Sequence, residues 1–295
     1  MEQNKRKISI YLLTSGHLEH GLWFREDEDF KVAMNYVAIQ AACYSEVVVL
    51  AFVLMSNHVH FVLRGRRDEV VASVTQFKQR YALYYRRKYG IKEFLRRNEL
   101  DIQQIPTEDE AVERTIAYVQ MNCVAANICS HPSQYPWGTG NTFFNTNKSV
   151  GKKLGEYSAR ARGRLMHSDC NKLPDRWRLF DGYILPVEYV DVKYVETLFR
   201  SPKRFNYFMN NSSKARKRIE TAEDHFPAFR DQTILVSIPD LCRSLFQKNS
   251  FKNLQESEQV EFVRQIRFRF SADANQIARV CGIPYAEAAR LLDGV

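Results

Sequence analysis

Apolar residues change their spacing along the first 145 residues in a pattern that predicts alternating strands and helices. Ile8 to Leu13 and Val47 to Leu54 have the apolar content of strands, and Val59 to Leu63 can pair with the second of these across a short turn. Asp27 to Ser45, which is rich in Ala, Val and Tyr, predicts a helix. Because continuous apolar strands suit a sheet that helices cover on at least one face, we predict an α+β sandwich.

A long helix is predicted from Glu69 towards Tyr89. Its apolar positions alternate between spacings of four and three, which is the stripe that a helix buries in a core. The opposite face is basic, and such a face is either solvated or follows the phosphates of a nucleic acid. The expected buried stripe is Val70, Val74, Phe77, Tyr81 and Tyr84, and the basic face is Lys78, Arg86, Arg87 and Lys88.

A further helix should begin near Thr107 and Glu110, whose spacing fits a capping box. Acidic residues in its first turn favour the same start. The expected buried stripe is Val112, Ile116, Val119, Cys123 and Ala126. Tyr118 then lies one step round the helix from the core face, a position from which it can face a cleft.

Beyond residue 145 the pattern changes. Residues 146–235 form a basic region that contains aromatic residues and has no assigned role, and residues 236–295 are predicted to be helical. Gln276 to Ile283 and Pro284 to Leu292 fit a DNA-binding helix-turn-helix, with Gly282 at the turn and Ala288 and Leu292 packing inward. A helical hairpin that only packs is the alternative. The predicted DNA contacts in these two regions are Lys214, Arg216, Lys217, Arg218, Arg279 and Arg290; for the cluster at 214–218 a solvated face is the other interpretation.

The most informative chemical feature is a pair of histidines on an apolar strand. Successive strand side chains point to opposite faces, so His58 and His60 project from one face while Val59 and Phe61 project from the other. Two imidazoles are then close enough to share one cation. Tyr118 and Asn122 are four residues apart on a helix and lie on one face of it. Two nitrogens and one amide oxygen with open positions suit Mg²⁺ or Mn²⁺ better than a closed zinc site.

Such a site would turn Tyr118 into a nucleophile. The pKa of a free tyrosine is about 10, so its hydroxyl needs an adjacent cation or base at neutral pH. A divalent ion would polarise a phosphate, and attack by Tyr118 would leave a covalent phosphotyrosine and free a hydroxyl. That chemistry fits nucleic-acid strand cleavage in which the bond energy is conserved for rejoining.

Other interpretations of the same residues exist. Taken separately, the histidines fit two satisfied core side chains, and Tyr118 fits a packing residue. Histidine-triad nucleotide hydrolases are disfavoured because Val62 stands where a third alternating histidine is expected. Cyclic phosphodiesterases are disfavoured because the paired His-x-Thr or His-x-Ser elements are missing.

Three elements together resemble the REP-associated tyrosine transposases, relatives of the single-tyrosine HUH transposases of small insertion sequences. They are Met55-Ser56-Asn57-His58-Val59-His60, Tyr118-x-x-x-Asn122 and Pro132-Ser133-Gln134-Tyr135-Pro136-Trp137. The resemblance covers roughly the first half of the chain. It implies an HUH-type antiparallel sheet with packed helices over residues 1–145. Cys123 stands where the family usually has proline, and Gly138-Thr139 stands where a serine pair is usual.

The resemblance also implies the roles of the site residues. His58 and His60 would bind the metal, Asn122 would be the third ligand and Tyr118 the nucleophile of a metal-dependent single-strand DNA endonuclease and strand transferase. Its partner would be single-stranded or hairpin DNA from short repeats, and no small-molecule cofactor beyond the metal is expected. The alternative is a non-catalytic DNA-binding regulator that has kept the HUH fold.

Composition agrees with a polyanionic partner. The chain has 295 residues and a formal net charge of +9. Its six cysteines include no Cys-x-x-Cys pair, which argues against a zinc ribbon and against a disulfide framework. The apolar run from Val47 to Met55 is too short to cross a bilayer, and no secretory segment is evident. We therefore expect a bacterial cytoplasmic protein with no membrane partner, and the sequence leaves its oligomeric state open.

Overall fold

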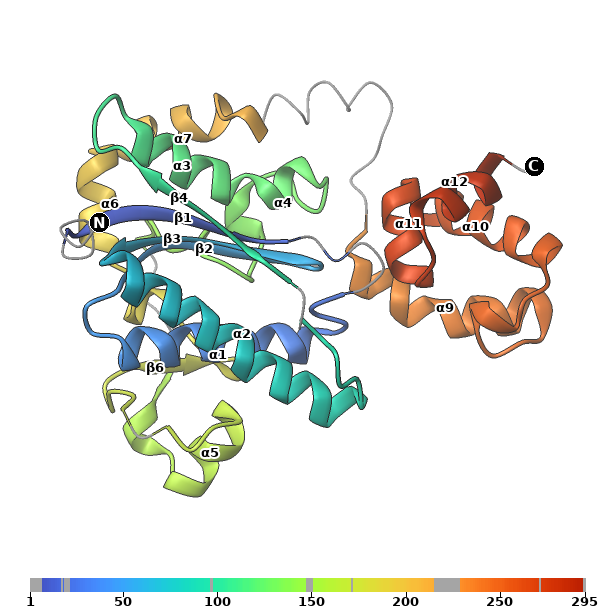
Figure 1. Cartoon of the computed structure of the whole chain (residues 1–295), viewed down its shortest axis with the longest axis horizontal. Coiled ribbons are helices and arrows are strands. Elements are labelled where there is room, and N and C mark those ends of the chain that lie inside the picture. The colour runs from blue at the N-terminus through green and yellow to red at the C-terminus, as the bar shows by residue number, and fades with distance from the viewer. Residues whose placement is uncertain are drawn as a thin grey trace.

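A computed structural model describes residues 7–16, 18, 22–95, 98–146, 151–170, 172–214, 229–270 and 272–293. Its centre is a four-stranded antiparallel sheet in the order β2-β3-β1-β4, which confirms the predicted α+β class. Figure 1 shows α1 and α2 on one side of this sheet and α3 and α7 on the other. The strands are β1 (Ser9–Ser15), β2 (Val48–Met55), β3 (His58–Gly65) and β4 (Leu100–Ile105).

Three of these strands follow the predicted ranges closely. β2 and β3 are almost wholly buried and pair across a short turn, as their continuous apolar sequence predicts. β4 was not predicted, because Leu100–Ile105 lies at the sheet edge and three of its six residues carry polar side chains. An edge strand of this kind lacks the apolar run that identified the others.

The helices on the first face are α1 (Asp27–Cys43) and α2 (Arg67–Tyr89). All five residues predicted for the α2 stripe are buried. The two helices are joined by Asp29, which has no exposed surface and whose carboxylate accepts hydrogen bonds from the hydroxyls of Tyr84 (2.9 Å) and Tyr89 (2.7 Å) and the ammonium of Lys88 (2.7 Å). A buried carboxylate with this many donors is well compensated for its lost hydration.

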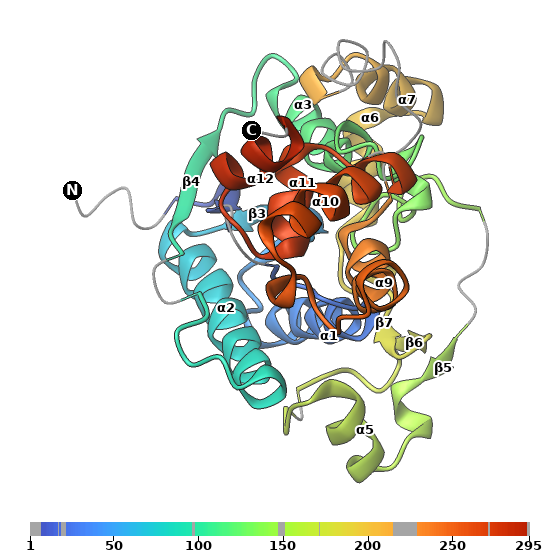
Figure 2. The same cartoon turned by 90° about the vertical axis from the view of Figure 1, so that its right-hand side faces the viewer.

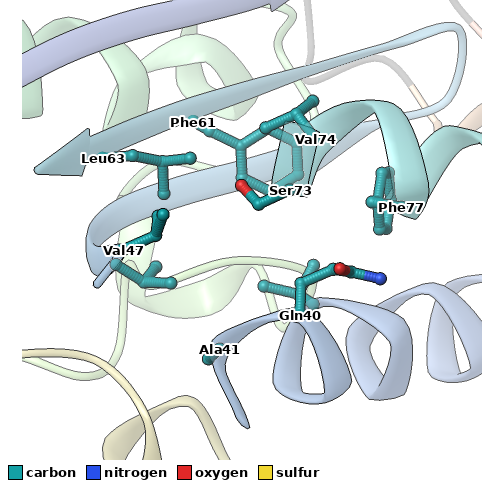
Figure 3. Close-up of a pocket in the computed structure, with 10 residues that line it drawn as sticks. Gln40, Ala41, Val47, Phe61, Leu63, Ser73, Val74 and Phe77 are labelled. Carbon is teal, nitrogen blue, oxygen red and sulfur yellow. The ribbon is translucent and has the colours of Figure 1, made fainter. Parts of the chain in front are cut away.

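A small cavity of about 20 Å³ lies between these helices and the sheet. Figure 3 shows Gln40 of α1, Ser73 of α2 and Phe61 of β3 around it. In the described part of the chain the Gln40 amide has no hydrogen-bond partner, and most of the side chains that line the cavity are apolar. The cavity is too small for a nucleotide, and it lies on the side of the sheet to which Phe61 points.

The opposite face is covered by α3 (Ala111–Gln120), which continues through Met121 into α4 (Asn122–Ala125). The predicted capping box of Thr107 and Glu110 is wrong. Glu110 adopts a left-handed conformation (φ 59°), and its carboxylate pairs with Arg204 (2.8 Å) and Arg114 (3.1 Å) instead of capping the helix. Glu110 therefore makes ion pairs, one of them with Arg204 of α7, which is far away in the sequence, and does not cap α3 with its side chain.

Residues 151–210 add to the same core as the sheet. Leu154, Leu179 and Phe199 belong to the hydrophobic cluster that contains the β2 and β3 side chains. Val190 forms a parallel bridge with Val49 of β2. The elements of this region are β5 (Lys152–Lys153), α5 (Ala159–Met166), β6 (Arg178–Phe180), β7 (Tyr183–Ile184), α6 (Val192–Phe199) and α7 (Pro202–Asn210).

The C-terminal helices form a second hydrophobic cluster of their own. Figure 2 shows them in front of the sheet unit. α11 and α12 lie in the two segments predicted for the helix-turn-helix, with Gly282 between them in a left-handed conformation (φ 67°) that suits glycine. Ala288 packs inward as predicted, but Leu291 rather than Leu292 is the fully buried leucine. The helices are α9 (Asp231–Phe246), α10 (Glu256–Phe270), α11 (Ala274–Cys281) and α12 (Tyr285–Asp293), and no described helix has the length and apolar content to span a membrane.

Candidate nuclease site

The histidine pair lies at the beginning of β3. The two ring centroids are 4.8 Å apart, and the ring planes are nearly perpendicular. Phe61 points to the other face of the sheet, where its ring contacts Phe77 of α2 at 5.4 Å. The predicted alternation is therefore confirmed: His58 and His60 share one face, and their neighbours face α1 and α2.

Each imidazole is held by an oxygen at its Nδ1 atom. Thr14 Oγ1 of β1 lies 2.9 Å from Nδ1 of His60, and Thr14 and His60 are cross-strand partners. Asn57 Oδ1 lies 2.9 Å from Nδ1 of His58. Outer contacts of this kind fix the ring orientation of metal-binding histidines, whose other nitrogen, Nε2, is then the ligand atom.

Tyr118 reaches this pair from α3. Its ring centroid is 5.8 Å from that of His60, in an edge-to-face arrangement. The side chain is half-buried, and burial raises the pKa of its phenol above the usual value. The ammonium of Lys214 lies 4.8 Å from the centre of the Tyr118 ring. Tyr118 thus contacts both an imidazole and a cation, which the electron-rich face of the ring attracts.

Asn122 lies one helical turn beyond Tyr118, at the start of α4, and is buried. Its Nδ2 donates to the carbonyls of Tyr118 (2.9 Å) and Val119 (3.2 Å), so the side chain closes the end of α3. Among the described residues, a ring contact joins His60 to Tyr118, and Asn122 donates its hydrogen bonds to carbonyls of α3. No group of three or more His, Cys, Asp and Glu side chains in the described ranges could hold a metal ion.

The loop after α4 positions the tyrosine helix on the sheet edge. Thr139 accepts a hydrogen bond from Gln120 Nε2 (2.6 Å), and its backbone N–H donates to the carbonyl of Phe52 in β2 (3.0 Å). Gly138 forms a bridge with Val53, where a Cβ atom would lie 2.7 Å from the Phe52 carbonyl oxygen. Gln120 and Thr139 were not predicted as supporting residues, because a single glutamine and threonine have no spacing pattern in the sequence.

The basic face of α2 is not beside this site. α2 lies on the side of the sheet opposite α3 (Figure 1), and Arg86 and Arg87 of α2 are exposed. Lys88 pairs with Asp29, and the half-buried ammonium of Lys78 donates to the Asn98 carbonyl. Whether these residues contact DNA stays a prediction. Periodicity showed that α2 has a basic face, but it does not show which face of the sheet the helix covers.

The remaining predicted DNA contacts fall into two groups. Arg279 is mostly buried and pairs with Asp231 (2.9 Å), and Arg290 pairs with Glu256 (2.6 Å) and Glu287 (2.7 Å). The ion pair between Arg279 and Asp231 therefore links α11 to α9. Arg216, Lys217 and Arg218 lie outside the described residues.

Comparisons with known proteins give little beyond these observations. No protein-family model matches the sequence, and no curated protein is similar to it. Among solved structures, a REP-associated tyrosine transposase bound to a REP hairpin is similar over 50% of this chain and 92% of that chain, with 14% identity and a TM-score of 0.34. A similarity at this level shows neither a family nor a function for this chain.

Proposed function

We propose that the protein is a metal-dependent HUH single-strand DNA endonuclease and strand transferase of the REP-associated tyrosine transposase type, with Tyr118 as its nucleophile. The observation that carries the proposal is the convergence of three aromatic side chains. His58 and His60 share one face of β3, and Tyr118 meets His60 from α3. Each of these side chains alone could be a packing residue. The proposal is supported because all three belong to the sequence motifs and also contact one another in the order His58, His60, Tyr118.

The donor set fits a divalent cation such as Mg²⁺ or Mn²⁺. His58 and His60 would hold it through Nε2, since each Nδ1 is engaged by an oxygen. Asn122 anchors its amide nitrogen on α3, and its Oδ1 atom would be the third ligand. The bound cation would supply positive charge to the phosphate under attack.

Tyr118 would carry the covalent step. Its phenol loses a proton to solvent, the phenolate oxygen forms a bond to the phosphorus, and the bond to the 3′ oxygen of the preceding nucleotide breaks. That oxygen takes up a proton, which leaves a 3′ hydroxyl and a 5′-phosphotyrosine. Attack by a 3′ hydroxyl on the same phosphorus reverses the step and joins a strand. Lys214, over the Tyr118 ring, would offset the cost that burial imposes on the phenolate.

The substrate that we infer is DNA with a folded hairpin and a single-stranded flank. The net charge of +9 favours a polyanion, and unpaired bases can stack on aromatic and arginine side chains. The α11–α12 hairpin would help to hold the duplex part. Figure 1 places this helical unit at one end of the sheet unit.

The test is reaction with labelled hairpin oligonucleotides in Mn²⁺ or Mg²⁺, followed by denaturing electrophoresis and peptide mass spectrometry. Wild type should form a 5′ adduct on Tyr118, and Tyr118→Phe should form none. Tyr207→Phe is the matched control, because Tyr207 is 62% exposed and its ring contacts Phe208 rather than either histidine. His58→Ala and His60→Ala should bind DNA but not cut it, since the basic residues supply the affinity.

Three results would contradict the proposal. They are cleavage that survives Tyr118→Phe, an adduct on another tyrosine, and full activity in excess chelator. DNA binding by wild type without cleavage in any divalent metal would instead support the regulator that has kept the HUH fold.

A further inference from the structure

Two cysteines that are distant in sequence lie side by side on the α1 side of the molecule. The sulfur of Cys43, the last residue of α1, is 3.7 Å from the sulfur of Cys170, in the loop after α5. Both side chains are partly exposed, whereas Cys123, Cys242 and Cys281 are buried. The two sulfurs need to approach by less than about 2 Å to reach the S–S bond length of about 2.05 Å.

The surroundings let a reagent reach the pair. Both cysteines line a surface hollow of about 380 Å³, together with Tyr44, Arg80 and Lys172. Burial and the neighbouring Cys170 raise the pKa of the Cys43 thiol, and Lys172 and Arg80 act in the opposite direction. The two cations also favour the approach of an anionic reagent.

The segment that carries Cys170 is already fixed against α1 and α2. Asn35 of α1 donates to the carbonyl of Leu165 (3.2 Å), and the hydroxyl of Tyr36 donates to the carbonyl of His167 (3.2 Å). Arg80 of α2 donates to the hydroxyl of Ser168 (3.3 Å). The contacts hold the two sulfurs together without help from a bond between them.

We propose that Cys43 and Cys170 form a reversible redox pair, which a low-molecular-weight disulfide converts into an intramolecular disulfide. One cysteine thiolate attacks the reagent, forms a mixed disulfide and releases one thiol. The second cysteine thiolate then attacks the protein sulfur of that mixed disulfide and releases the second thiol. The two cysteines lose two electrons and two protons, and the reagent is reduced to two thiols. This inference is independent of the proposed nuclease activity.

The experiment uses the full-length, reduced protein under native conditions and glutathione disulfide as the probe. After the incubation, free thiols are alkylated, and the digest is analysed by mass spectrometry without reduction. A cross-linked peptide pair joining Cys43 to Cys170 should appear, and dithiothreitol should remove it. It should be lost in Cys43→Ser and in Cys170→Ser but retained in Cys129→Ser, the matched control with similar exposure.

Either of two results in folded wild type would overturn the proposal. One is that both cysteines are recovered alkylated after the incubation. The other is that each carries its own glutathione, since a second thiolate held at this distance should displace it. Because the wild-type peptide map alone decides between these results, a variant that fails to fold does not weaken the test.

Discussion

Thr14 gives the sharpest test of how the site is built. Its hydroxyl lies 2.9 Å from Nδ1 of His60 and is the β1 contact that orients this imidazole. Thr14→Val keeps the shape of the side chain and removes the hydroxyl. If His60 is a metal ligand, Thr14→Val removes the oxygen beside Nδ1 of its ring and leaves the metal-binding atom, Nε2, in place.

The expected size of the effect can be stated for stability and for metal binding. Loss of one hydrogen bond costs about 0.5–1.5 kcal/mol of unfolding free energy, so Thr14→Val should remain folded. Loss of an outer-shell partner weakens metal affinity roughly 10–100-fold, which corresponds to about 1.4–2.8 kcal/mol. Metal binding should therefore change more than stability does.

The assay is a Mn²⁺ titration, read both as direct metal binding by calorimetry and as cleavage of a hairpin oligonucleotide. The midpoint of the Mn²⁺ titration should move to a roughly 10–100-fold higher concentration in Thr14→Val. Thr14→Ser, which keeps the hydroxyl, should stay close to wild type. Equal midpoints for the valine variant and wild type, in protein with normal thermal unfolding, would refute the role of Thr14 in orienting a ligand.

Three further predictions concern stability, measured by urea unfolding. Gly138→Ala should cost about 1–3 kcal/mol, because its Cβ would lie 2.7 Å from the Phe52 carbonyl oxygen, whereas Gly163→Ala, with an ordinary contact of 3.7 Å inside α5, should be neutral or stabilising. Asp29→Ala should cost about 1–3 kcal/mol for each of the Tyr84 and Tyr89 hydroxyls that lose their acceptor, while Lys88 keeps its ion pair with Glu26. A total loss below about 1 kcal/mol would contradict that account. Burial raises the pKa of Tyr36 from 10.0 to about 12. The unfolded chain therefore loses the phenol proton first, and the free energy of unfolding should fall by about 3 kcal/mol as the pH rises from about 10 to about 12. The fall should be smaller in Tyr36→Phe.

Local periodicity in the sequence was enough to predict the parts of the site that lie on single elements. A period of two fixes His58 and His60 on one face of a strand, and a period near four places Asn122 one turn from Tyr118. The continuous apolar runs identified β2 and β3, and Gly282 marked the turn between α11 and α12. These features depend on residues within a few positions of each other, so the sequence alone determines them.

Tertiary structure decided which elements meet. The sequence shows that α2 has a basic face, but only packing places it across the sheet from Tyr118. Lys214 lies over the Tyr118 ring, and Arg279 is paired with Asp231, through contacts between residues that are far apart in the chain. Such contacts form only when the apolar faces of several elements are buried together and bring distant segments side by side. No local spacing records that outcome, because it depends on the whole core rather than on either partner.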